Sequence, residues 1–105
     1  MINLKKKNNG IFYSKKNIEF INYKHINFLK KKVKFVKNKR ARICLHNNDK
    51  SKLQEMIIIL AKDTYIRPHK HLNKSESLHV IEGSADAIFF DNKGNIIKKQ
   101  RLGGK

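Results

Sequence analysis

The spacing of apolar residues changes near residue 39, and this change constrains the fold more than any other feature of the sequence. Between residues 22 and 37 the apolar residues recur at intervals of three and four, which predicts an amphipathic helix with lysines on its outer face. The stretch RARICLHNN, residues 40–48, instead alternates, with Ala41 and Ile43 on one face, which predicts a strand. We therefore expect a helix followed by strands.

Further segments predict strands. LQEMIIILA (53–61) is apolar and rich in β-branched residues, as in a strand covered on both faces. SADAIFF (84–90) and NIIKKQRL (95–102) flank DNKG, which predicts a hairpin with glycine as its left-handed turn residue. A loose basic leader is expected over residues 1–10, with a short strand at 11–13. Because the strands after the helix follow one another directly, the sequence predicts a mainly β, antiparallel sandwich or barrel.

The charge of the chain has two explanations. A formal net charge of +17 raises nucleic acid or an anionic surface as a partner. However, lysine outnumbers arginine 21 to 4, and asparagine and isoleucine are equally abundant for the chain's length. An AT-rich coding sequence produces all three residues together, whereas nucleic-acid binding explains only the lysine. We expect no specific nucleic-acid partner; a non-enzymatic basic protein that binds nucleic acid or acidic polysaccharide is the alternative.

The sequence also predicts the compartment. Cys44 is the single cysteine, so no intrachain disulfide can form, which fits a reducing cytosol. The first ten residues lack the apolar run of a signal peptide, and the longest apolar run, Met56–Ala61, is far too short to span a membrane. We therefore expect a cytoplasmic protein without a membrane span.

His69, His71 and Glu76 form the pattern most typical of a chemical site. Strand alternation would place the two histidines on one face, and LNKS after them lets the chain turn so that Glu76 faces them. Two imidazoles and one carboxylate suit a divalent iron, manganese, nickel or zinc ion, with positions left open for water or substrate. The alternative is that the histidines are a solvated pair in a polar loop.

The spacing His69-x-His71-x4-Glu76-x6-Gly83 resembles the first motif of the cupin superfamily, G-x5-HxH-x3,4-E-x6-G, although Asp63 stands where that motif begins with glycine. Together with RARICLH and FFDNKGNIIK, it resembles the WbuC family of cupin-fold metalloproteins, which are linked to surface-polysaccharide genes. The resemblance implies an N-terminal helix followed by an incomplete cupin double-stranded β-barrel. It also implies a basic leader and helix over residues 1–38, a partial cupin domain over 39–105, and a small-molecule or sugar-nucleotide substrate.

The residues after Gly83 do not match the second cupin motif, which supplies a further histidine ligand in that superfamily. The resemblance is therefore to a cupin cut off after its first half. Such a half-barrel would expose apolar surface, so we expect aggregation or a homodimer. A gene fragment without a function of its own is the other interpretation.

Arg42, Cys44 and His46 share one face of the strand expected after residue 39. By the resemblance this face lines the barrel mouth, where Arg42 and His46 would bind substrate, the arginine through a phosphate or carboxylate. The structural alternative is an edge arginine, an inert buried cysteine and an exposed histidine. Nothing in the sequence indicates a base that would make Cys44 a nucleophile.

Overall fold

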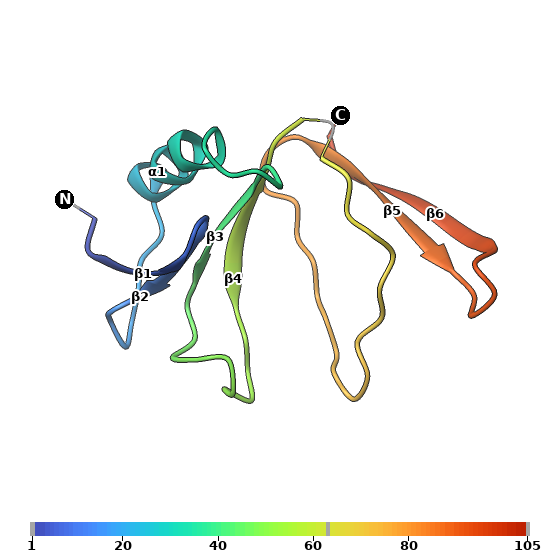
Figure 1. Ribbon diagram of the computed structural model, residues 1–105, viewed down its shortest axis with the longest axis horizontal. Coiled ribbons are helices and arrows are strands. Elements are labelled where there is room, and N and C mark those ends of the chain that lie inside the picture. Colours follow the sequence, from blue (N-terminus) through green and yellow to red (C-terminus); the bar gives the residue numbers. More distant parts are fainter. Residues whose placement is uncertain (1, 63, 105) are drawn as a thin grey trace. The chain divides into compact units, whose positions relative to one another are not determined.

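A computed structural model describes residues 2–62 and 64–104 of the chain. It divides into two compact units, Met1–Tyr65 and Ile66–Lys105, and both contain antiparallel strand pairs (Figure 1). The described residues contain strands and a single helix, so the prediction of a mainly β protein is confirmed. Asp63, the position at which the cupin motif has its first glycine, lies outside the described residues.

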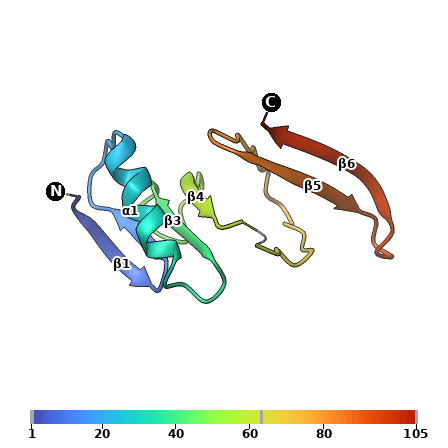
Figure 2. The ribbon, with the colours of Figure 1, turned by 90° about the horizontal axis from the view of Figure 1, so that it is seen from above.

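The Met1–Tyr65 unit is built on a four-stranded sheet in the order β1-β2-β3-β4. Its outer pairs are antiparallel, whereas β2 and β3 run parallel. A parallel pair needs a long crossover connection, and helix α1 supplies it, lying along one face of the sheet (Figure 2). The elements are β1 (Leu4–Asn8), β2 (Ile11–Ser14), α1 (Tyr23–Val33), β3 (Arg40–Cys44) and β4 (Met56–Leu60).

Two expectations are wrong in this unit. The helix is not N-terminal, because the basic leader forms β1 and pairs with β2 before α1 begins. The sheet is not wholly antiparallel either, since α1 returns the chain beside β2 in the same direction. Gly10 makes the β1–β2 hairpin compact: its φ is +84°, and a Cβ there would lie 2.8 Å from the backbone oxygen of Arg40. Only glycine suits this position without strain.

Helix α1 begins at a capping box in which histidine replaces the usual glutamate. The Asn22 side chain accepts a hydrogen bond from the backbone N–H of Lys24 at 2.9 Å. The Nδ1 atom of His25 accepts one from the backbone N–H of Asn22 at 3.2 Å. Both bonds satisfy N–H groups that a helix start leaves unpaired. The helix ends at Val33, before the predicted limit, with lysines in its last turn that oppose the negative end of its dipole.

The core of this unit lies between α1 and the inner face of the sheet. The alternation predicted for β3 is confirmed, because Ala41 and Ile43 are buried against the helix. The strand predicted to be covered on both faces, β4, is covered on one face only. Ile57 and Ile59 pack against the core, whereas Ile58 on the other face is 41% exposed. The buried core residues are Phe12, Leu29, Val33, Ala41 and Ile43.

The Ile66–Lys105 unit contains the predicted hairpin, β5 (Ser84–Phe90) and β6 (Ile96–Gly103), paired antiparallel. At its turn Gly94 has φ +88°, as expected for this glycine. The Asp91 carboxylate accepts hydrogen bonds from the backbone of the turn, and the bond from Asn95 is the main cause that lowers the pKa of Asp91. The turn is therefore held by an ionised aspartate.

Residues 66–83 form no helix or strand, so the strand expected at His69 and His71 is wrong (Figure 1). The extended pattern is present in the sequence, but an extended segment becomes a strand only when a neighbour pairs with its backbone. Within the described part of the chain, no helix has the length and apolarity needed to cross a membrane.

We expect Leu29→Ala to destabilise the Met1–Tyr65 unit by roughly 2–5 kcal/mol, because Leu29 is fully buried and alanine leaves a cavity without lowering helix propensity. The matched control is Leu53→Ala, since Leu53 is 72% exposed and should change stability by no more than about 0.5 kcal/mol. All three tyrosines lie at or before Tyr65, so tyrosine fluorescence during urea denaturation reports on this unit. Equal effects of the two substitutions would contradict the described core.

Candidate functional site

The segment that carries the predicted metal ligands is held by local contacts. The Nδ1 atom of His69 lies 3.0 Å from the backbone oxygen of Arg67, to which a protonated Nδ1 donates a hydrogen bond. This bond leaves the Nε2 atom with its lone pair free, which is the state a metal ligand needs. The ring of His71 stands beside that of His69, edge to face, with 4.9 Å between the ring centroids.

Glu76 reaches His71 because the chain turns between them. Asn73 has φ +59°, a left-handed conformation that asparagine tolerates better than most residues. The His71 Nε2 and Glu76 Oε2 atoms lie 3.1 Å apart. Their side chains are 45% and 61% exposed, so an ion pair here contributes little to stability. The contact places two good metal donors side by side rather than holding the fold.

The structure does not bring all three predicted ligands around one point. In residues 2–62 and 64–104, no group of three or more His, Cys, Asp or Glu side chains is arranged to hold a metal ion. His71 and Glu76 are in contact, and His69 lies next to His71 through its ring. The set of His69, His71 and Glu76 as metal ligands therefore stays a prediction.

Arg42, Cys44 and His46 lie on the outer side of the sheet or just beyond the end of β3. Arg42 is half-buried, and its Nε atom is buried without a hydrogen-bond partner among the described residues. Cys44 is 1% exposed, and burial raises the pKa of its thiol, which disfavours the reactive thiolate. The His46 Nδ1 atom lies 3.1 Å from the backbone nitrogen of Glu55. Cys44 is thus a packing residue, while Arg42 has unused hydrogen-bonding capacity.

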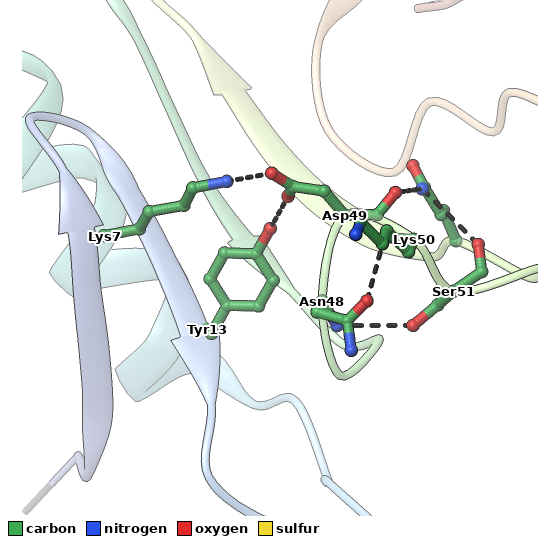
Figure 3. A network of polar contacts seen from close by, with 7 residues as sticks. Lys7, Tyr13, Asn48, Asp49, Lys50 and Ser51 are labelled. Carbon is green, nitrogen blue, oxygen red and sulfur yellow. Dashed lines mark hydrogen bonds and ion pairs between the residues drawn. The ribbon is translucent and has the colours of Figure 1, made fainter.

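A polar network beside this face was missed by sequence reasoning. Asp49, in the loop after β3, binds the Lys7 ammonium group with one carboxylate oxygen and the Tyr13 hydroxyl with the other (Figure 3). The ring of Tyr13 also meets His46 edge to face, with 5.6 Å between centroids. The loop itself is closed by Asn48, whose backbone N–H donates to Ser51 and whose side chain accepts from Lys50. Asp49 therefore ties the loop to β1 and β2.

These contacts change the pKa values of all three groups. The hydrogen bond from Lys7, followed by that from Tyr13, holds the pKa of Asp49 below its ordinary value. The hydrogen bond to Asp49 raises the pKa of Lys7, although burial opposes this change. The hydrogen bond to Asp49 also raises the pKa of Tyr13, and there burial acts in the same direction. Asp49 is thus ionised and Lys7 protonated near neutral pH. The residues Asn47–Ser51 are typical of a turn, and that was the only signal in the sequence that pointed to this loop.

The fold and these sites define a mainly β protein with a helix-covered sheet and a separate β-hairpin. A family model, that of a domain of unknown function (DUF6016), matches residues 21–102, which is well over half of the chain. The protein belongs to the DUF6016 family. The matched region includes Arg42, His46, His69, His71 and Glu76. No curated protein and no solved structure matches the chain.

The Asp49 network predicts a pH dependence. Folding lowers the pKa of Asp49, so its contribution to stability is complete above its ordinary value of 3.8 and is lost as the pH falls through its lower folded value. We expect Asp49→Asn to be less stable than the parent by a constant amount between about pH 5 and 8, and this difference to close at lower pH. Urea denaturation followed by tyrosine fluorescence at a series of pH values would measure it.

Glu55→Gln is the matched control, because the contacts of Glu55 in the same loop are made by its backbone. It should not reproduce the acid-dependent difference. A difference between the parent and Asp49→Asn that persists unchanged to roughly pH 2.5 would show that ionised Asp49 does not stabilise the fold.

Proposed function

We propose that this protein is a cupin-like, WbuC-related protein that binds one divalent metal ion through His69, His71 and Glu76. The observation that carries the proposal is the 3.1 Å separation between the His71 Nε2 and Glu76 Oε2 atoms. Nitrogen and oxygen ligands lie about 2.1 Å from ions such as Zn²⁺, so neighbouring ligands of one ion are about 3.0 Å apart in an octahedral site and about 3.4 Å apart in a tetrahedral one. The spacing of these residues in the sequence, which resembles the first cupin motif, supports the same assignment.

His69 is the third proposed ligand. Its Nδ1 atom faces the Arg67 carbonyl oxygen, which orients the ring and favours the tautomer with a free Nε2 lone pair. All three side chains are exposed, so they can change rotamer without opening a packed core. Iron, manganese, nickel and zinc all suit this donor set, and the residues present do not select among them.

A metal ion in such a site supplies a Lewis acid that polarises a carbonyl group or activates water. The resemblance to a family linked to surface polysaccharides leads us to propose a sugar nucleotide or glycan precursor as substrate. From the resemblance alone we also propose that Arg42 and His46, which belong to the Met1–Tyr65 unit, bind a phosphate or carboxylate group. A cytoplasmic location is part of the proposal, since the single cysteine is buried as a thiol.

The test is metal binding by the purified full chain, measured by calorimetry with Zn²⁺ and by the visible absorption of bound Co²⁺, which reports its ligands. We expect His71→Ala and Glu76→Gln each to weaken binding at least about tenfold, because each removes one of few ligands. His79→Ala is the matched control: His79 is an exposed histidine of the same segment and should leave binding unchanged. Full binding by His71→Ala, or an equal loss in His79→Ala, would overturn the assignment.

A further inference from the structure

A second site lies in the Met1–Tyr65 unit, where β1, the end of β2 and the loop after β3 enclose an open groove of about 590 Å³. This volume is within the range of about 300–1,000 Å³ that holds small ligands in proteins. Four of the nine lining residues are lysines. The lining includes Lys5, Lys6, Lys7 and Lys15, together with Tyr13 and Asp49.

The groove carries an excess of positive charge that the protein does not neutralise. Among the described residues of its lining, Asp49 is the only one with a carboxylate side chain, and that carboxylate is bound to Lys7 and Tyr13. Among residues 2–62 and 64–104, the structure gives Lys5, Lys6 and Lys15 no carboxylate partner. Lys5 pairs with Tyr13 and shares its face of the sheet, whereas Lys6 pairs with the buried Phe12 and its side chain belongs to the other face. Lys5 and Lys15 therefore border the groove as exposed lysines without a counter-ion from the described part of the chain, and such an arrangement attracts a multiply charged anion.

The contacts of Tyr13 argue against recognition of nucleic-acid bases in this groove. Tyr13 is 7% exposed, and its hydroxyl group is bound to Asp49 (Figure 3). The Lys7 ammonium group lies over the ring of Tyr13, 5.6 Å from the centroid, and His46 packs against the same ring. The face of this ring is thus not available for stacking, which is the interaction that proteins use to hold single-stranded bases. Tyr13 is also the only aromatic residue of the lining. The remaining way for this groove to recognise a ligand is through hydrogen bonds from its lysine ammonium groups to phosphate oxygens.

We infer that this groove binds a small ligand with two or more linked phosphoryl groups, such as inorganic pyrophosphate or the diphosphate of a nucleotide. Lys5 and Lys15 bind the phosphate oxygens. Asp49 holds Lys7 and Tyr13 in place and, through its own charge, limits how much anion the groove attracts. The inference does not depend on the proposed metal site, because none of the groove residues belongs to it.

The test is calorimetric titration of the metal-free full chain with pyrophosphate, orthophosphate and a single-stranded oligonucleotide. We expect pyrophosphate to bind more tightly than orthophosphate, because it presents more charge to the same lysines. Replacing Lys5 and Lys15 together by glutamine should weaken pyrophosphate binding at least about tenfold. The matched control replaces Lys31 and Lys34, which are exposed and do not line the groove, and should change binding by no more than about twofold.

Asp49→Asn should change the affinity for pyrophosphate in the opposite direction. It removes the negative charge of the groove and releases Lys7, so it should tighten pyrophosphate binding several-fold. Equal losses in the two double variants would show that binding reflects net charge alone and would overturn the inference. Binding of the oligonucleotide without pyrophosphate would identify a nucleic-acid surface instead, and no binding of either would also overturn it. Because these titrations are done without metal, their outcomes do not depend on the proposed metal site at His69, His71 and Glu76.

Discussion

Packing of α1 against the inner face of β3 is the interaction on which the Met1–Tyr65 unit depends. Leu29 from the helix and Ile43 from the strand are both fully buried, and the remaining core residues surround them. The helix is also the connection that makes β2 and β3 parallel, so the sheet order follows from the same element. With its inner face covered, the sheet presents Tyr13 beside the loop of Asp49, and the polar network is a consequence of that packing.

Much of this architecture could be predicted from residue spacing. The positions of α1 and β3 follow from periods of three to four and of two, because burial of one face imposes those periods. The β5–β6 hairpin follows instead from the DNKG turn between two strand-like segments. β1 could not be predicted in this way, since Leu4 is its only apolar residue among lysines. Lysines on such an edge strand discourage pairing with other chains. The parallel pairing of β2 with β3 was also hidden, because periodicity identifies strands but not their neighbours.

For the candidate sites too, contacts between residues close in sequence could be predicted, whereas contacts between distant residues could not. The approach of Glu76 to His71 could be predicted, since only four residues, with a turn at Asn73, separate them. The strand expected at His69 was wrong, because alternation alone does not supply a pairing partner. Asp49 was missed as a site residue for a different reason: it contacts Lys7 across 42 positions of sequence. Contacts of that range arise from topology, which the spacing of charged residues does not encode.

The exposure of the β5–β6 hairpin affects the rate of amide hydrogen exchange in this part of the chain. The hairpin is a two-stranded sheet, and several of its apolar side chains lie at the surface, including Phe89, which is 50% exposed, and Ile97, which is 66% exposed. Two strands without a covering layer are only marginally stable in water. Its amide hydrogens should therefore exchange with solvent through frequent local opening, while those of β3 are released mainly when the whole helix-covered unit unfolds.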